Sequence, residues 1–455
     1  MSLRARLLSA VVIIALAAGL FAVSLFGTGT PGGASESLFS SRTTLNLWYS
    51  DADLMDYLND AAVSYNNSQS KVRVEPKLMD AANYFQEIND ASVQDRDLPD
   101  VFIIGNDSLG RAWLAGLASQ VVNDSHFSST QTYPQAALDA VTYEGNYVAY
   151  PLCFETGALL YNRDYLADMA DAAGVAAGDA VPGTMVDIIN MANSYDAPEE
   201  VSAVLKWDVS DIFYNYGFVG AYMDVGGRAG DNPDKLSVYN DKLISCMQVY
   251  QQLNSYFAID TDTDDYEDVI SDFADGRIVF TFATSDAVKT IRDRIAAGDS
   301  SIDYGVAAIP DSTAELATKT MSVTQCLVIN GYSTHSAEAG DFIRYLLYQH
   351  MQDFYDRTGK PPAQAGYAYS DEHMNGFYDA YTDSVPITKL REASNFWMML
   401  ENAFSQVWNG ADANSTLHDL DQQLMVQITG NEEYRVDTLP DPEPVNISSE
   451  LTGMD

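Results

Sequence analysis

The segment GNYVAYPLCFETGALLYNRDYL, residues 145–166, decides how the rest of the chain is interpreted. A turn signal lies at Glu144–Gly145, because glycine tolerates the positive φ that a tight turn needs. Pro151 cannot donate to a sheet ladder, so it belongs at a strand end or a sheet edge. A carboxylate between two apolar runs is costly to bury without a partner, so Glu155 is expected to face a cavity, a partner or water. The segment alone favours a surface hairpin with one solvated glutamate.

Composition indicates a folded and strongly acidic body. The 455 residues carry 24 Lys+Arg against 65 Asp+Glu, a formal net charge of −41, and 47% of them are hydrophobic. Such a charge repels phosphate backbones, which argues against nucleic acid as a partner. The hydrophobic content is too high for a disordered acidic chain, and the length allows two or three domain-sized units.

The N-terminus has the features of an export signal. Arg4 and Arg6 precede the uncharged run Leu7–Phe26, and this order leaves the remainder of the chain outside the cytoplasm. About 20 apolar residues can span a bilayer, so a retained signal anchor is expected, with cleavage near Gly32–Ala34 as the alternative. Together with the Gly/Ser/Thr linker that follows, this assigns residues 1–42 to a leader and linker.

After the linker, strand and helix patterns alternate. Thr43–Tyr49 and Val72–Leu78 alternate as strands, and Val101–Ile104 is a short apolar strand, with helical periods between them. This alternation predicts parallel crossovers and an α/β sheet, whose ligands bind beyond the carboxyl ends of the strands. The loops that begin at Tyr49 and at Asn106 therefore lie at a predicted binding edge.

Two segments of the chain resemble extracellular solute-binding proteins, the sugar-binding subunits of ABC importers. One is residues 145–166, with its Tyr-Pro, Glu and Tyr-Asn-Arg-Asp elements. The other is LPDVFIIGNDSLGRAWLAGLASQV, residues 98–121, with Pro-Asp, an apolar strand and an Asp at the start of a helix. The resemblance implies an α/β, two-lobed periplasmic-binding-protein-like (type II) fold with a hinge and an interlobe cleft.

The same resemblance implies the domain organisation. Residues 43–152 plus 326–365 form the first α/β lobe, and residues 153–325 plus 366–430 form the second. The remaining residues, 431–455, are acidic, contain proline and are poor in apolar side chains, which predicts a flexible tail.

The resemblance also nominates ligand-binding residues. Glu155 falls where the family's Glu faces the sugar, and Asp107 where an Asp contacts the ligand, although Asp107 also fits an N-cap. Trp207 and Trp397 match segments whose aromatic residue lies against the sugar. Trp397 also lies on the apolar stripe of a helix expected over about Ile387–Trp408, which predicts core equally well. The expected ligand-binding residues are Tyr49, Ser50, Asp51, Asn106, Asp107, Glu155, Trp207, Asp286 and Trp397.

The cysteines allow a test of the hinge. Cys153 and Cys326 fall on the two segments that resemble lobe crossings, which run side by side in the family. The two residues are therefore expected to be close, with Cys246 away from them in the second lobe. A disulfide between the crossings would restrain closure, so free thiols are expected.

No catalytic residue, metal site or cofactor is predicted. The sequence contains no GxSxG, HExxH or CxxC pattern, and its five histidines have no metal-ligand spacing. We expect a monomeric protein that binds a neutral oligosaccharide and passes it to an ABC permease in the membrane. A cationic ligand such as a polyamine, a tethered extracellular sensor domain and a carbohydrate-active enzyme are the alternatives.

Overall fold

The computed structural model describes residues 42–449, apart from 95–96, 123, 125–126, 128–129, 258, 260–263 and 394. The expected signal anchor, Leu7–Phe26, and the alternative cleavage region near Gly32–Ala34 lie outside the described residues. Within the described part of the chain, no helix is both long enough and apolar enough to span a membrane.

The first sheet has the strand order β14-β13-β3-β1-β2, with β6 paired to β13. Its strands are β1 (Thr43–Tyr49), β2 (Val72–Leu78), β3 (Val101–Gly105), β6 (Tyr150–Thr156), β13 (Met321–Ile329) and β14 (Val385–Pro386). β1 pairs in parallel with both β2 and β3, as the strand and helix alternation predicted. β13 pairs antiparallel with β3, so the sheet is mixed.

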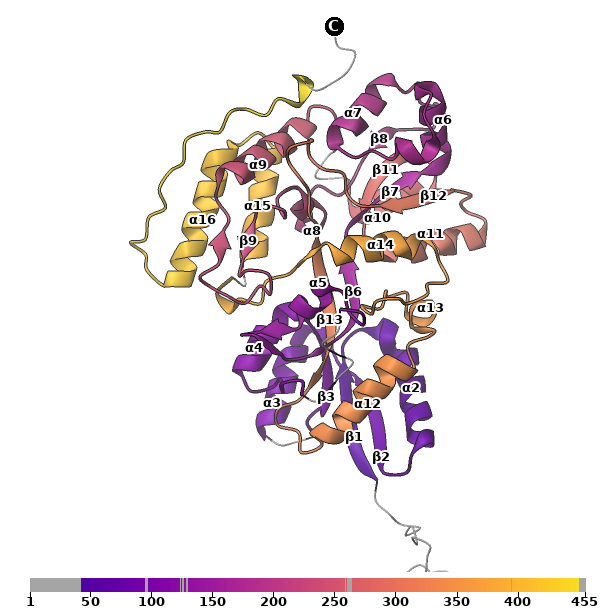
Figure 1. Ribbon diagram of the computed structural model, residues 1–455, viewed down its shortest axis with the longest axis vertical. Helices are drawn as coiled ribbons and strands as arrows, with labels where there is room; N and C mark the ends of the chain where they lie inside the picture. Colours follow the sequence, from indigo (N-terminus) through magenta and orange to yellow (C-terminus); the bar gives the residue numbers. More distant parts are fainter. Residues whose placement is uncertain are drawn as a thin grey trace, which may run out of the picture.

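Helices surround this sheet in the lower body of Figure 1. They are α2 (Met55–Ser68), α3 (Tyr84–Gln94), α4 (Leu109–Leu114), α5 (Gln135–Ala140), α12 (Ser336–Gln349) and α13 (Phe354–Thr358). The hairpin of β4 (Thr142–Tyr143) and β5 (Asn146–Tyr147) precedes β6. It turns at Glu144 and Gly145, both with positive φ (49° and 75°), so the predicted turn is confirmed.

The second sheet has the order β12-β7-β11-β8 and lies in the upper body. Its strands are β7 (Ala158–Asn162), β8 (Ala203–Leu205), β11 (Ile278–Ala283) and β12 (Tyr304–Ala307), and a separate hairpin contains β9 (Asp224–Val225) and β10 (Leu236–Ser237). The helices of this body are α6 (Arg163–Ala173), α7 (Met185–Ser194), α8 (Ile212–Asn215), α9 (Asp241–Leu253), α10 (Tyr266–Ala274), α11 (Asp286–Ala297), α14 (His373–Thr382), α15 (Phe396–Trp408) and α16 (Ala413–Thr429). Short 3-10 turns complete the fold: η1 (Ala52–Leu54), η2 (Ala81–Asn83), η3 (Asn106–Ser108), η4 (Ala177–Ala180), η5 (Tyr216–Phe218), η6 (Arg391–Ala393) and η7 (Ile447–Ser449).

β6 and β13 connect the two bodies as an antiparallel pair at the waist of the molecule (Figure 1). β6 leads within two residues into β7 of the second sheet, and β13 carries the chain back to the first. The molecule is thus two-lobed, with these strands as its hinge. The lobe boundaries inferred from the sequence stay a prediction.

The core continues through the hinge. One cluster of buried apolar residues extends from the first sheet, through β6 and α14, to one face of the second sheet. A second cluster covers the other face of the second sheet and includes α9, α15 and α16. Successive side chains of β7 point to opposite faces of the second sheet, so Leu160 belongs to the first cluster and Leu159 to the second.

Two features of the C-terminal region differ from prediction. The helix predicted over about Ile387–Trp408 begins at Phe396. Ile387 instead follows the strand β14, with its N donating to Ser322 O at 3.0 Å, and Arg391–Ala393 form a 3-10 turn. The tail was expected to be flexible, but residues 431–449 are attached to the second lobe. Ile447 is fully buried, and the Gln252 amide donates to Val445 O at 2.7 Å.

Candidate functional site

A pocket of about 130 Å³ lies at the hinge, where segments from both lobes meet. Asp51 enters it from the loop that follows β1, and Asp286 enters it as the first residue of α11. The lining comprises Asp51, Cys153, Phe154, Glu155, Ser285, Asp286, Val323, Gln325, Gly359, Lys360 and Pro361. Strand ends and loops deliver the charged groups, in agreement with the binding edge predicted for α/β sheets.

The crossing strands form one wall of the pocket because of their register. Glu155 pairs with Val323 and Cys153 pairs with Gln325 in the antiparallel ladder. Residues opposite each other in such a ladder project to the same face of the sheet, and alternate residues along a strand share that face. All four residues therefore line the pocket from one face of the hinge.

The predicted proximity of the two hinge cysteines is confirmed, since they lie on neighbouring strands, and Cys246 is on α9 in the second lobe. All three cysteines are free and buried. The register shifts between Gln325 and Cys326, and Cys326 pairs with Pro151. Because Cys326 follows Gln325 directly, its side chain is on the face opposite to Cys153. Burial raises the pKa of the Cys153 thiol to about 12, so this thiol is protonated at neutral pH.

One ammonium group lies among the pocket carboxylates. Lys360 Nζ is 2.9 Å from Asp51 Oδ2 and 3.4 Å from Asp53 Oδ2. Partial burial lowers the pKa of Lys360, but the hydrogen bond and charge of Asp51 outweigh it and raise the pKa above its usual value. Lys360 therefore stays charged and is already paired. Sequence reasoning missed this residue, which lies near the predicted end of the first-lobe segment at residue 365.

Glu155 is the unpaired acid of the pocket. Solvent reaches its side chain, yet protein surrounds the carboxylate closely, and no hydrogen-bond partner for it occurs in the described part of the chain. Desolvation is the largest cause that raises the pKa of Glu155, and repulsion from Asp286 and Asp51 adds to it. The charge of Lys360 acts in the opposite direction. A raised pKa in a pocket between lobes is typical of a functional group.

Asp286 is held by hydroxyl groups of the second lobe. The Tyr266 hydroxyl donates to Asp286 Oδ1 at 3.0 Å, and Thr284 Oγ1 donates to the same oxygen. The Tyr266 ring stacks on Tyr214, with centroids 4.9 Å apart and planes 14° apart. The sequence did not predict this aromatic pair, because its two residues lie on different helices, α8 and α10, that meet only in the folded lobe.

Three expected ligand-binding residues are structural, which corrects the prediction. Tyr49 is 2% exposed, because it ends β1 with its ring in the first core cluster. Asn106 is fully buried, donates to Ile387 O at 3.1 Å and accepts from Thr324 N at 2.8 Å, so its amide binds the hinge backbone. Trp207 is fully buried, donates to Asn215 Oδ1 at 3.0 Å and contacts the rings of Phe282 and Trp408.

Three other expected residues lie outside the pocket lining. Ser50 is half-buried between Tyr49 and Asp51. Asp107 is exposed at the start of η3 and accepts from Ser108 Oγ at 3.3 Å. Trp397 is half-buried, and its ring lies edge-on to Tyr216 at 5.6 Å. The position of Trp397 at the border of the core leaves both interpretations of this ring open.

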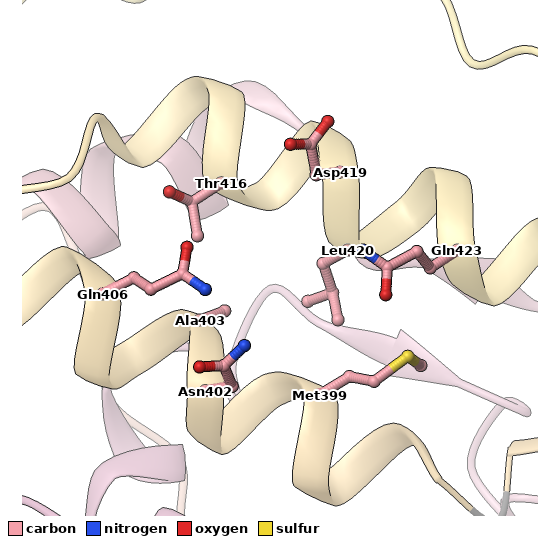
Figure 2. A pocket seen from close by; sticks show the side chains of 8 residues that line it. All are labelled: Met399, Asn402, Ala403, Gln406, Thr416, Asp419, Leu420 and Gln423. Atoms are coloured by element: carbon pink, nitrogen blue, oxygen red, sulfur yellow. The ribbon is translucent and has the colours of Figure 1, made fainter.

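Two further hollows differ from the hinge pocket in chemistry. One of about 110 Å³ separates α15 from α16, where Asn402 and Gln406 face Thr416 (Figure 2). The other, of about 480 Å³, lies between the end of α12 and residues 364–368 of the first lobe. Of the three, the hinge pocket alone has lining from both lobes and contains an acid with a raised pKa, which makes it the candidate binding site. In the described residues no cluster of three or more His, Cys, Asp or Glu side chains fits a metal ion.

Comparison with protein families identifies one matching model, described as bacterial extracellular solute-binding protein, over residues 60–377. A curated relative, the maltotriose-binding protein of Pyrococcus abyssi, is 23% identical over 216 residues. That alignment covers 47% of this chain and 42% of the relative, so less than half of the relative's length is matched.

Solved structures share the fold at low sequence identity. An extracellular solute-binding protein from Staphylococcus aureus in complex with maltose has a TM-score of 0.72 at 17% identity, covering 86% of this chain and 98% of its own. A cyclo/maltodextrin-binding protein complexed with maltotetraose has a TM-score of 0.72 at 18% identity, covering 87% and 99%. The maltose-binding periplasmic protein of Listeria monocytogenes, in complex with maltose, has a TM-score of 0.69 at 19% identity, covering 87% and 100%.

Proposed function

The chain belongs to the family of bacterial extracellular solute-binding proteins, and from this membership and the hinge pocket we propose that it binds a neutral oligosaccharide between its lobes. The observation that carries the proposal is Glu155. Its carboxylate faces a pocket lined from both lobes, and it has no hydrogen-bond partner among the described residues. Sugar hydroxyls are neutral donors that satisfy such an acceptor without adding charge.

Other residues of the pocket support this ligand class. Asp51 and Asp286 add acceptors from opposite lobes, so a hydroxyl-rich ligand between them would draw the lobes together. The stacked Tyr214–Tyr266 pair holds Asp286 in place, because the Tyr266 hydroxyl donates to its carboxylate. The relatives described above bind maltose, maltotriose or maltotetraose, which makes α-linked glucose oligomers the first ligands to test.

The proposed partner is an ABC permease that accepts the unaltered sugar from the closed protein. Binding without turnover accords with the family, whose members are described as solute-binding proteins. The location follows the same reasoning, with the chain on the outer face of the membrane and retained there by the apolar run Leu7–Phe26. Intact-mass measurement of membrane-extracted protein should find residue 1 or 2 at the N-terminus, whereas a mature start near Ser35 would replace the anchor by a cleaved signal.

A cationic ligand is the second candidate, because the pocket has a local excess of negative charge. Asp51, Glu155 and Asp286 line it together with a single amine, Lys360, which is already paired. A polyamine would complement this charge.

A ligand panel separates the two candidates. A ligand at 100 times its dissociation constant stabilises the folded state by about 2.7 kcal/mol, which gives a clear thermal shift. Maltose, maltotriose, maltotetraose, spermidine and neutral amino acids should be screened at low and at high salt, with product analysis of each mixture. A shift with maltotriose that resists salt supports the sugar. A shift with spermidine alone, abolished by salt, supports the cation, and hydrolysed sugar identifies an enzyme.

A further inference from the structure

The backbone around Lys360 is held on both sides, which fixes the point from which its side chain enters the hinge pocket. α13 ends at Gly359, whose φ of 71° forms the left-handed C-cap of the helix, and the Lys360 amide donates to Thr358 Oγ1 at 3.1 Å. On the other side, the Phe154 amide of β6 donates to Pro361 O at 3.0 Å. Lys360 is therefore placed between a helix end and a hinge strand, and its side chain lines the pocket from there.

The side chain of Lys360 completes the bonding of Asp51. Asp51 Oδ1 accepts from Asp53 N at 3.0 Å and so caps η1, whereas Lys360 Nζ lies 2.9 Å from Asp51 Oδ2. Each carboxylate oxygen of Asp51 thus has a partner of its own. The side chains of Lys360 and Asp51 are 30% and 32% exposed, so this ion pair borders the pocket and is within reach of a ligand.

The charge of Lys360 also acts deeper in the pocket. It opposes the rise in pKa that burial causes at Cys153 and at Glu155. The lining contains three carboxylates, from Asp51, Glu155 and Asp286, and among the described residues it contains no other Lys, Arg or His. Lys360 is therefore the counter-charge of this lining, and without it the carboxylates would face the pocket with no cation beside them.

A bound cation and a bound hydroxyl group would experience this lysine differently. An organic cation that approached Asp51 would bring a second positive charge next to the Lys360 ammonium group, and like charges at such distances repel. A sugar hydroxyl carries no charge and can donate to a carboxylate without this repulsion. Discrimination between ligands often depends on such a repulsive element. Lys360 thus penalises a cation and not a neutral molecule in the same pocket.

We propose that Lys360 is a specificity-determining residue that excludes polyamines and other organic cations from the hinge pocket. The inference rests on the proposed function in taking the hinge pocket as the site of a neutral ligand. Removal of the ammonium group frees Asp51 Oδ2 and should turn the pocket into a cation site. A charge-assisted hydrogen bond corresponds to a factor of about 10 to 150 in affinity, and the exposure of the ion pair places the effect near the lower end.

Calorimetry of the full-length chain with spermidine at low salt, where charges are little screened, tests the proposal. Lys360→Met keeps an unbranched stem and removes the charge, Lys360→Arg keeps the charge, and Lys360→Met/Asp51→Asn also removes the freed carboxylate. Lys206→Met is the matched control, because Lys206 pairs with Asp264 at 2.6 Å but lies outside the pocket lining. Lys360→Gln takes the place of Lys360→Met if circular dichroism shows that the methionine variant does not fold.

Lys360→Met should bind spermidine about 10-fold more tightly than the parent. Lys360→Arg and the double variant should bind spermidine as weakly as the parent, because both preserve the charge balance of the pocket. Lys206→Met should do the same, because its lost charge lies elsewhere. Equal spermidine affinity in Lys360→Met and the parent overturns the proposal. An equal gain in Lys360→Arg or in Lys206→Met also overturns it, because the gain would not depend on the charge at this position.

Calorimetry of the parent with maltotriose separates this inference from the proposed function. A gain of spermidine binding in Lys360→Met, without binding of maltotriose or any other glycan to the parent, supports exclusion of cations by Lys360 and refutes the proposed sugar. Maltotriose binding to the parent, with equal spermidine affinity in the parent and Lys360→Met, supports the sugar and refutes exclusion by Lys360. Equally tight spermidine binding to both proteins without maltotriose binding refutes both and identifies a cation site.

Discussion

Substitution of Glu155 by glutamine should weaken ligand binding and stabilise the ligand-free protein at the same time. The change preserves the shape of the side chain and removes its charge. A hydrogen bond to a charged acceptor contributes about 1.5–3 kcal/mol and one to a neutral acceptor about 0.5–1.5 kcal/mol, so loss of the charge alone should cost about 1–1.5 kcal/mol and weaken maltotriose binding about 5- to 13-fold. Retaining the carbonyl oxygen as an acceptor makes this a smaller loss than truncation to alanine would cause.

The stability effect follows from the raised pKa of Glu155. A group whose pKa is higher in the folded state stabilises the fold only while it is protonated, and this contribution is lost as the pH rises through its folded pKa. Ionisation of Glu155 places its charge in a desolvated site that faces Asp286 and Asp51, and the neutral glutamine avoids that repulsion. The melting temperature of Glu155→Gln should therefore exceed that of the parent at pH 7. The difference should vanish below about pH 4, where the glutamate is protonated in both the folded and unfolded states.

Calorimetry with maltotriose and thermal unfolding from pH 3 to 8 measure the two effects. Glu199→Gln is the control, since this glutamate is exposed in a loop of the second lobe and should change neither quantity. If Glu155→Gln melts lower than the parent at pH 7 while maltotriose affinity is unchanged, Glu155 has a structural partner and the reasoning fails.

Three other predictions concern the core, the tail and the surface charge. Trp207→Ala should lower the free energy of unfolding by about 3–5 kcal/mol, because the fully buried ring lies in the second core cluster; a loss below 1 kcal/mol in chemical denaturation would return Trp207 to the list of ligand contacts. Ile447→Ala should detach residues 431–449 at a cost of about 2–5 kcal/mol and accelerate proteolysis within the tail, whereas equal cleavage rates in the parent and the variant would show that the buried contact does not hold it. With a net charge of −41, the melting temperature should rise as salt increases from 10 mM to 1 M, since the Debye length falls from about 30 Å to about 3 Å; a falling melting temperature would mean that attractive ion pairs outweigh the repulsion.

The parts of the fold that were predicted correctly depend on local periodicity. Thr43–Tyr49 and Val72–Leu78 have the bounds read from the sequence, because alternation and strand length are properties of the segment itself. The positions of Asp51 and Asp286 in the pocket also follow from the local sequence, because both residues come after the carboxyl end of a strand in an α/β lobe.

The errors concern properties that only tertiary packing decides. Lys360 owes its place to α13, which holds it opposite Asp51 from a distant part of the chain. Trp207 stands in an aromatic-rich segment, and such composition fits a stacking surface and a packed core equally well. Asn106 follows a strand, as a ligand-binding residue would. Its side-chain amide, however, forms hydrogen bonds with the backbone of Ile387 and Thr324.

The pairing of Cys153 with Gln325, one residue before Cys326, has a chemical consequence for a protein of an extracellular family. Outside the cytoplasm, neighbouring thiols are commonly oxidised to disulfides, and such a crosslink between β6 and β13 would immobilise the hinge. Because adjacent residues of a strand point to opposite faces, the two sulfur atoms lie on opposite sides of the ladder, and bond formation would require the strands to separate first. An offset of one residue in the pairing of the two strands therefore hinders a disulfide across the hinge.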